Sequence, residues 1–356
     1  MPTQQQAIVV EAPKGPFVLR PRLVPTPAEG EVLIKIMSAG LNPINWKQGA
    51  FNILIGEYPA VVGHDVAGIV EELGKGVEGL KKGDRVFAQT FNGGFQQYVA
   101  VPAAIVIPIP DNTSFDEATT FPVAFSTACV GLFASGPIGL GLNPTFSWDK
   151  PQQGQAALVI GGGQVGQFAI QLLKFAGFTR IVAYASKANF DYLGQLGATE
   201  CIDRSEVPVE SLAAHPALAS RVSVVYDAGY VSSFNAAYDA LVEGGKVVIT
   251  RPAAKLERDP EQKKLTLVRV QGYYAGPDVT KIKPDVVGYL ASPEHTVFGK
   301  LLIKNLPDML AKGAVSGNRY EVLPNGLAGI LEGLDRLRQG GVSAFKLVAH
   351  PQDPIA

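Results

Sequence analysis

The chain has 356 residues, of which 47% are hydrophobic and 18% are charged, and this length favours two globular domains over one. Its 31 basic and 32 acidic residues nearly cancel and form no long run of one sign, which argues against nucleic acid or an anionic membrane as the main partner. We expect no signal peptide and no membrane span, because no basic region with a long apolar run occurs. Two cysteines, Cys129 and Cys201, favour a reducing, cytoplasmic setting.

The first third of the chain has short apolar runs that are typical of β-structure, separated by clusters rich in glycine and proline. The expected strands are Gln6–Val10, Glu31–Ala39, Val66–Leu73, Arg85–Ala88 and Phe95–Val101. The pattern then changes, because Ser114 and Glu117 have the spacing of a capping box at the start of a helix. A second helix is expected over Phe125–Ala134, and a loop rich in glycine and proline follows over 136–155.

A strand, a glycine-rich turn and a helix are predicted near the middle of the chain, over Gln155–Gly177. Gly161, Gly163 and Gly166 have the GxGxxG spacing. The first glycine makes a tight turn, the second lets a phosphate approach the backbone and the third lets helix and strand pack closely. The apolar run Ala156–Ile160 precedes the turn, and an apolar pattern with helical spacing follows it. This context predicts a dinucleotide-binding site.

After this turn, strands and helices alternate, which is typical of a doubly wound parallel sheet. The expected elements are the strands Arg180–Ala185, Glu200–Asp203, Ser223–Asp227 and Lys246–Thr250 and the helices Phe190–Leu196 and Ser233–Val242. The tail returns to the style of the first third, with a helix over Asn325–Arg338 and a strand over Ala344–Ala349. We therefore expect an α/β fold with a discontinuous β-rich domain over 1–125 and 300–356 and a Rossmann domain over 126–299.

The end of the second strand of the expected sheet distinguishes NAD from NADP. An acidic residue there would bind the 2′-hydroxyl of the adenosine ribose, but this chain has Ser186 and Lys187, a hydroxyl and a cation that suit a 2′-phosphate. Tyr192 and Arg204 could add a second hydroxyl and a second cation. The alternative is that Lys187 and Arg204 are solvated surface charges. The missing carboxylate favours NADPH.

Three further motifs are Gly40–Lys47 (GLNPINWK), Gly63–Gly68 (GHDVAG) and Val342–Val348 (VSAFKLV). Together with the glycine-rich turn, they resemble the medium-chain dehydrogenase/reductase superfamily over nearly the whole chain. Within it, the chain is similar to the zinc-independent quinone-oxidoreductase and enoyl-reductase branch. The nearest subgroup is the fungal stand-alone enoyl reductases, including those that act in trans on polyketide synthases. The resemblance implies a GroES-like catalytic domain, a Rossmann domain and an active site in the cleft between them.

Zinc-dependent relatives hold a catalytic metal with Cys, His and Cys, and the resemblance places Asn42, His64 and Val123 at these positions. Valine offers no ligand and an amide is a poor one, so we expect no metal. The structural zinc loop is also missing, because residues 85–115 contain no cysteine. His64 is then expected to be a hydrogen-bonded structural histidine beside Asp65.

Without a metal, the accessible chemistry is hydride delivery to a carbon that a conjugated carbonyl already polarises. NADPH would reduce the β-carbon of an enone, an enoyl thioester or a quinone, and hydrogen-bond donors would stabilise the enolate oxygen. By resemblance, Lys47 is the candidate donor to this oxygen or to the nicotinamide ribose, and Asn42 and Thr127 orient the nicotinamide or the substrate. The family aspartate that usually precedes Trp46 is replaced by Asn45, which puts an acidic role there in doubt.

Motif and resemblance together give the candidate site. The candidate catalytic residues are Lys47, Asn42 and Thr127. The residues assigned to the cofactor are Asn45, Trp46, Lys47, Gly161, Gly163, Gln164, Val165, Gly166, Ser186, Lys187, Asn189, Tyr192, Arg204, Thr250, Val342 and Ser343. Tyr273 and Tyr274 are candidates for the lining of the substrate pocket, and Lys346 lies near the cleft by resemblance.

Two other functions stay open at this point. One is NADPH:quinone oxidoreduction with the same cofactor, because the sequence does not show the shape of the pocket. The other is a protein that binds NADPH without turnover and serves a structural or regulatory role. The expected substrate is a small or carrier-bound α,β-unsaturated carbonyl. The resemblance implies a polyketide synthase as a possible partner. The expected oligomeric state is a monomer or a homodimer.

Overall fold

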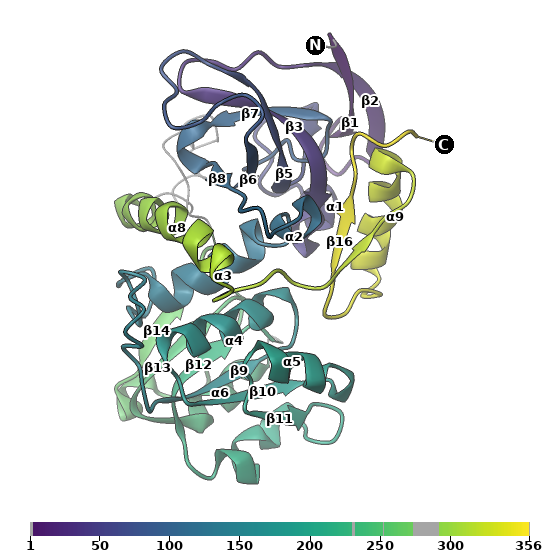
Figure 1. The fold of residues 1–356 in the computed structure, drawn as a ribbon. Helices are drawn as coiled ribbons and strands as arrows, with labels where there is room; N and C mark the ends of the chain where they lie inside the picture. Colours follow the sequence, from purple (N-terminus) through teal and green to yellow (C-terminus); the bar gives the residue numbers. More distant parts are fainter. Residues whose placement is uncertain (1–2, 230–231, 252, 273–291, 356) are drawn as a thin grey trace. The chain divides into compact units, whose positions relative to one another are not determined.

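The computed structural model describes residues 3–229, 232–251, 253–272 and 292–355, and the chain divides into two compact units (Figure 1). One unit contains Met1–Val123 and Tyr273–Ala356, and the other contains Ala124–Gly272. The sequence predicts boundaries at 125/126 and 299/300. The first lies close to the boundary in the structure, and the second lies 27 residues after it. Residues 273–291, including Tyr273 and Tyr274, lie outside the described ranges.

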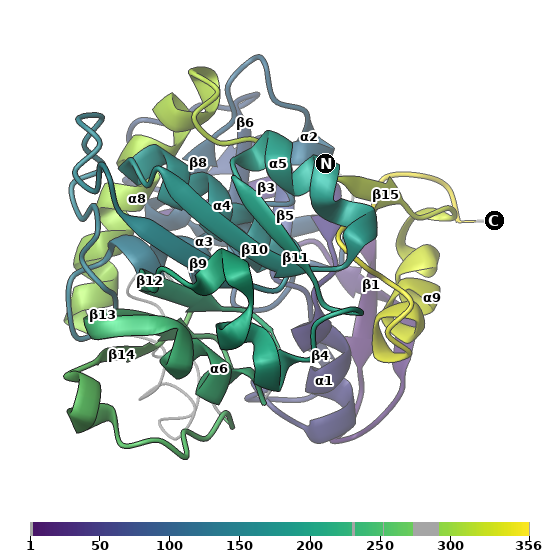
Figure 2. The ribbon, with the colours of Figure 1, turned by 90° about the horizontal axis from the view of Figure 1, so that it is seen from below.

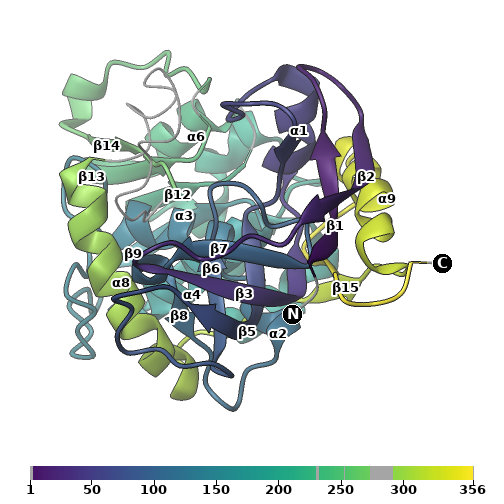
Figure 3. The same cartoon turned by 90° about the horizontal axis from the view of Figure 1, so that it is seen from above.

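The first unit is built on two largely antiparallel sheets (Figure 3). The larger sheet has the order β15-β16-β3-β5-β6-β8, with β7 paired to β3, and the smaller has the order β2-β1-β4. Helix α9 packs along β1, β2 and β16. The elements are β1 Gln4–Val10, β2 Phe17–Leu23, β3 Glu31–Gly40, α1 Pro43–Phe51, β4 Ala60–Val61, β5 Asp65–Leu73, β6 Arg85–Gln89, β7 Tyr98–Pro102, β8 Ile107–Pro108, α2 Phe115–Ala118, α8 Pro293–Ala311, β15 Tyr320–Val322, α9 Gly326–Arg338 and β16 Lys346–Ala349.

The second unit is a six-stranded sheet in which every strand pair is parallel. Its order, β11-β10-β9-β12-β13-β14, is that of a doubly wound dinucleotide-binding fold. Figure 2 shows α4 and α5 on one side of this sheet and α6 on the other. The elements are β9 Ala156–Ile160, α4 Gln164–Ala176, β10 Arg180–Ala185, α5 Phe190–Leu196, β11 Glu200–Asp203, β12 Val222–Asp227, α6 Ser233–Ala240, β13 Leu241–Ile249 and β14 Thr266–Arg269, and α3 Pro122–Phe133 begins at the boundary between the units.

The core of the second unit follows from its apolar pattern. Strand β9 is buried along almost its whole length, because α4 and α6 both contact it. The apolar stripe of α4, which includes Phe168 and Leu172, is fully buried. Gly177 ends α4 in the left-handed conformation, with φ +101°, and its N–H donates to the carbonyl groups of the last turn. These elements hold the glycine-rich turn at the carboxyl end of the sheet.

The expected fold class, a β-rich GroES-like unit with a doubly wound parallel sheet, is confirmed. Some element bounds were wrong. Helix α6 ends at Ala240, two residues before its expected end, and β13 starts at Leu241, five residues before its expected start. The last strand starts at Lys346 and not at Ala344, because Ala344 has φ +61° and cannot continue a strand.

The capping box at the start of α2 forms only in part. The Ser114 hydroxyl accepts a hydrogen bond from the N–H of Glu117, as expected. The Glu117 carboxylate accepts from the N–H of Gly317, 200 residues away, and does not close the box. Helix α2 is four residues long. No described helix is both long enough and apolar enough to span a membrane.

Candidate functional site

The turn between β9 and α4 has the geometry of a phosphate-binding loop. Gly161 has φ +105°, a conformation that residues with a side chain rarely adopt. A Cβ on Gly166 would lie 1.8 Å from the carbonyl oxygen of Gly161, so this position requires glycine. Gly163 is the N-cap of α4, and a Cβ there would meet nothing within 4 Å. The turn therefore leaves space for an anion at the positive end of a 13-residue helix.

This turn lies beside the loop that follows β12, because β9 and β12 are neighbours at the point where the strand order reverses. The N–H of Ala228 donates to the carbonyl of Ile160 at 2.9 Å. The Asp227 carboxylate accepts from the N–H of Gly229 at 3.0 Å and from the Ser233 hydroxyl at 2.7 Å. Burial raises the pKa of the Asp227 carboxyl. Asp227 thus fixes the loop that borders the glycine-rich turn.

Thr250 joins the same edge of the sheet. Its N–H and its hydroxyl both donate to the carbonyl of Asp227, each at 3.1 Å. The guanidinium of Arg251 donates to the carbonyl of Gly229. Sequence reasoning missed the roles of Asp227 and Arg251, although polar residues at the carboxyl end of an apolar strand in a doubly wound sheet are a signal for this edge.

The carboxyl ends of β10 and β11 bring the predicted adenosine-binding residues together. The N–H of Arg204 donates to the carbonyl of Ala185 at 3.0 Å, and the N–H of Asn189 donates to that of Ser186 at 3.0 Å. Lys187 is exposed, with its ammonium group 3.9 Å from the Glu206 carboxylate. Tyr192 follows in the first turn of α5. The predicted hydroxyl and cationic groups therefore share one edge of the second unit.

Asp203 ends β11, and its carboxylate is a candidate to bind the ribose 2′-hydroxyl in place of the acidic residue that is missing from the end of β10. Its Oδ1 accepts from the N–H of Ser205 at 3.0 Å, and hydrogen bonds from Ser205 lower the pKa of the carboxyl. The backbone N–H of Lys187 donates a further hydrogen bond to the Asp203 carboxylate. The Asp203 carboxylate is thus hydrogen-bonded to Ser205 in the loop after β11 and to the backbone of Lys187 after β10. Thr127 lies elsewhere in the second unit, on α3, where a Cβ on Gly272 would clash with its hydroxyl.

The first unit contains a buried polar cluster of Asn42, Asn45, His64, Asp65 and Lys346. The side-chain N–H group of Asn42 donates to Oδ2 of Asp65 at 2.8 Å, and its Oδ1 accepts from the Lys346 ammonium at 2.8 Å. The amide of Asn45 lies 2.8 Å from Nδ1 of His64. Lys346 forms an ion pair with Asp65. Sequence reasoning named all five residues separately but missed the cluster, because Asn42 and Lys346 are 304 residues apart.

Electrostatics keep the histidine of this cluster neutral. Burial lowers the pKa of His64 from 6.5 to about 4, with opposite contributions from the charges of Asp65 and Lys346. An uncharged imidazole can accept a hydrogen bond from Asn45. His64 therefore has the hydrogen-bonded environment that the sequence predicts for it.

Helix α1 carries the remaining candidates of the first unit. Asn42 is its N-cap, Asn45 is fully buried in its first turn, and Trp46 and Lys47 are half-buried. The Lys47 ammonium lies 5.7 Å from the centre of the Trp46 ring, within the range of a cation–π contact. Ser343 is exposed in the segment before β16. The roles assigned to these residues toward a cofactor stay predictions.

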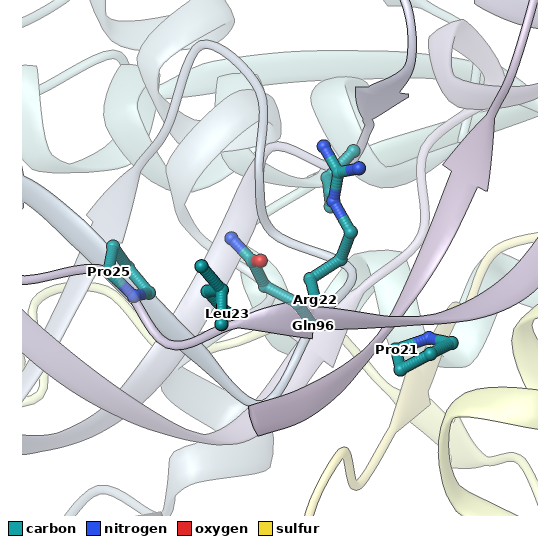
Figure 4. A pocket seen from close by; sticks show the side chains of 6 residues that line it. Pro21, Arg22, Leu23, Pro25 and Gln96 are labelled. Atoms are coloured by element: carbon teal, nitrogen blue, oxygen red, sulfur yellow. The ribbon is translucent and has the colours of Figure 1, made fainter. Parts of the chain in front are cut away.

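The first unit also has a surface hollow (Figure 4). It has a volume of about 530 Å³, between β2, β4 and the segment before β7. Its lining residues are Pro21, Arg22, Leu23, Pro25, Val61 and Gln96. None of them is a predicted site residue, so the hollow does not mark the candidate site.

Known proteins match the chain over nearly its full length. The alcohol dehydrogenase GroES-like domain matches residues 28–111, and the zinc-binding dehydrogenase family matches residues 165–283. A trans-enoyl reductase of Gibberella fujikuroi is 31% identical over 90% of this chain and 91% of that protein. The NADPH-dependent alkenal/one oxidoreductase of Arabidopsis thaliana is 34% identical over 64% of this chain and 56% of that protein. An alcohol dehydrogenase superfamily protein from Novosphingobium aromaticivorans has a crystal structure with a TM-score of 0.77 at 28% identity, covering 97% of this chain and 98% of that one.

The chain belongs to the medium-chain dehydrogenase/reductase superfamily. The resemblance to its enoyl-reductase branch is confirmed as well. Members of this superfamily are nicotinamide-dependent oxidoreductases, and the edge of the parallel sheet fits such a cofactor through its glycine cradle and its open space at Gly163.

One matching family is described as zinc-binding, so the donor groups of this chain decide whether a metal fits. The amide of Asn42 is held by Asp65 and by the Lys346 ammonium, and Val123 has no donor atom in its side chain. Nδ1 of His64 faces an amide. Across the described ranges, no three His, Cys, Asp or Glu side chains form a metal-binding group. These residues do not fit a catalytic zinc site.

Proposed function

We propose that this protein reduces the carbon–carbon double bond of an α,β-unsaturated carbonyl, an enone or an enoyl thioester, with NADPH and without a metal. The observation that carries the proposal is the polar cluster of the first unit, in which an ammonium group lies between Asn42 and Asp65. A site without Lewis-acid ligands is suited to an acceptor that is already polarised by conjugation. The names of the two relatives described above support the same reaction class.

The proposal assigns NADPH to the carboxyl edge of the parallel sheet. The pyrophosphate would bind at Gly161, Gly163 and Gly166, where a helix N-terminus meets open space. Ser186 and Lys187 would hold the 2′-phosphate by a hydroxyl and a cation, and no carboxylate of β10 competes for that place. When bound, NADPH supplies the hydride for the β-carbon of the substrate.

The chain's own residues then stabilise the charge that develops on the carbonyl oxygen. Lys47 is proposed to donate a hydrogen bond to this enolate oxygen or to the nicotinamide ribose, as its cation and its reach permit. Thr127 and Asn42 are proposed to orient the nicotinamide carboxamide or the substrate. A proton from a side chain or from water completes the α-carbon.

The test is the oxidation of NADPH and of NADH with an enone, an enoyl thioester and a quinone, after dialysis against a chelator. We expect oxidation with the enone or the thioester, a preference for NADPH, and no loss of rate after dialysis. Oxidation with the quinone alone would indicate the quinone reductase instead. Tight NADPH binding without any oxidation would contradict an enzymatic role, and a zinc-dependent oxidation of alcohols would contradict the metal-free mechanism.

A further inference from the structure

A lysine ammonium lies at the centre of the polar cluster of the first unit, away from solvent. The side chains of Lys346 and Asp65 are both 0% exposed. The ammonium donates to the Asp65 carboxylate and, at 2.8 Å, to the side-chain oxygen of Asn42. The other carboxylate oxygen accepts from the N–H of Val123 at 3.0 Å. Both buried charges are therefore paired and hydrogen-bonded.

The backbone provides the space that this ammonium needs. Gly40 ends β3, and a Cβ there would lie 2.7 Å from Cε of Lys346 and 2.8 Å from the carbonyl oxygen of Thr119. On the other side, Ala344 adopts φ +61° two residues before Lys346, an uncommon conformation for a residue with a side chain. The absence of a side chain at Gly40 and the uncommon backbone conformation of Ala344 thus both allow Lys346 to lie in the cluster.

The ammonium contacts the N-cap residue of the helix that carries Lys47. Asn42 is the N-cap of α1, and its side chain is held between Lys346 and Asp65. Its backbone N–H donates to the side-chain oxygen of Asn45 at 2.7 Å, which closes the first turn. Lys47 follows within the next turn, and a helix is rigid over that distance. The direction of Lys47 therefore depends on how Asn42 is held.

We infer that Lys346 is a positioning residue, a built-in cation that holds the N-cap of α1 and thereby sets the place of Lys47. The inference rests on the proposed function, in which Lys47 donates to substrate or cofactor. A buried ion pair adds little stability compared with apolar packing of the same volume. The geometry that the pair imposes on Asn42 explains its presence better than stability does.

The double variant Lys346→Met/Asp65→Asn removes both charges and keeps the approximate volumes. We expect an unfolding midpoint close to that of the wild type but a kcat for the enone that is lower by about ten- to a hundredfold, because small misplacements of a catalytic group are costly. Binding of adenosine 2′,5′-bisphosphate, which probes the parallel sheet alone, should be unchanged. A wild-type kcat in this variant would show that the pair does not position Lys47 and would overturn the inference.

Gly40→Ala tests the same point with all charges in place. The added Cβ displaces Lys346, so we expect a similar loss of kcat. Gly194→Ala is the matched control, because nothing lies within 4 Å of a Cβ at that position. Lys82→Met is the second control, because it removes the exposed ion pair with Glu71 in the same unit. Full activity of Gly40→Ala, or an equal loss in the controls, would overturn the inference.

A readout that needs no turnover separates this inference from the proposed function. The chain has two tryptophans, Trp46 beside Lys47 on α1 and Trp148 in the second unit. In a Trp148→Phe background, we expect the double variant and Gly40→Ala to shift the Trp46 emission and to change its quenching by acrylamide, whereas Gly194→Ala does neither. Unchanged Trp46 fluorescence would overturn the inference. Changed fluorescence in a protein whose wild type reduces no enone would contradict the proposed function alone.

Discussion

Lys187 lies two residues beyond the end of β10, and Asp203 ends the neighbouring strand β11, but their charges have different surroundings. The Lys187 side chain is 73% exposed, and its nearest anion, the Glu206 carboxylate, is 3.9 Å away at an equally open position. Such an exposed pair holds a cation only weakly. The Asp203 carboxylate accepts hydrogen bonds from Ser205 and from the backbone of Lys187. At this edge, the cation is therefore accessible to a 2′-phosphate and the carboxylate is already engaged.

Replacing the hydroxyl and the cation after β10 by a carboxylate should shift the cofactor preference from NADPH towards NADH. In the variant Ser186→Asp/Lys187→Ala, a carboxylate replaces the hydroxyl and the cation is lost, so we expect the ratio of kcat/KM for NADPH to that for NADH to fall by about a hundredfold. Steady-state kinetics with both cofactors measures this ratio. Lys264→Ala, which removes another exposed cation paired with Glu243, is the control and should leave the ratio unchanged. An unchanged ratio in the double variant would place the 2′-phosphate elsewhere.

His64 should make stability depend on pH. Its pKa is about 4 in the folded chain and 6.5 when unperturbed, so the unfolded state binds more protons between these values. The free energy of unfolding should fall as the pH drops from 6.5 towards 4, by up to about 3 kcal/mol. Denaturant titrations of the wild type and of His64→Gln across this range measure the effect, and the variant should lose most of this slope. An equal slope in both proteins would mean that other groups cause the acid sensitivity.

At the scale of elements, two glycines of the turn between β9 and α4 have different roles, Gly166 in stability and Gly163 in binding. A Cβ on Gly166 would collide with the Gly161 carbonyl, whereas a Cβ on Gly163 would project into open space. We expect Gly166→Ala to lower the free energy of unfolding by about 1–3 kcal/mol or more. Gly163→Ala should change it by less than about 1 kcal/mol but raise the Kd for NADPH by about tenfold or more, because the pyrophosphate must approach this backbone.

Denaturant titration and fluorescence titration with NADPH measure the two effects separately. Each glycine variant is the control for the other, since they differ by only three positions in the same turn. Normal NADPH affinity in Gly163→Ala would contradict the proposed position of the pyrophosphate. Normal stability of Gly166→Ala would contradict the close packing of the turn.

Elements with a strong periodic pattern were predictable from the sequence. Strand β9 has the bounds of the expected apolar run, and helix α4 lies within the expected range Gln155–Gly177. Helix α8 was missed, although its 19 residues bury an apolar stripe, because Pro307 lies inside it and proline usually ends a helix. Strand β2 was missed because it contains Pro21 and two arginines, Arg20 and Arg22, which an edge strand tolerates. Tertiary packing overrides the local pattern in both cases.

At the scale of the whole molecule, the candidate site draws on residues that are far apart in the chain. Sequence motifs identified Asn42, His64 and the glycines separately. The ion pair of Asp65 with Lys346 joins positions 281 residues apart, and no local pattern predicts such a contact. Asp227 was missed for the related reason that its role depends on the neighbouring strand β9. The fold class was thus readable from motifs, and the buried network was not.

The most direct test of a metal-free conjugate reduction is the position of the transferred hydrogen. The purified protein, freed of metals by a chelator, would be incubated with an enone and with NADPH that carries deuterium at the transferable position of C4. We predict a saturated ketone with deuterium on its β-carbon, found by NMR and mass spectrometry. Deuterium on the carbinol carbon of an allylic alcohol, formed only after zinc is restored, would contradict the account.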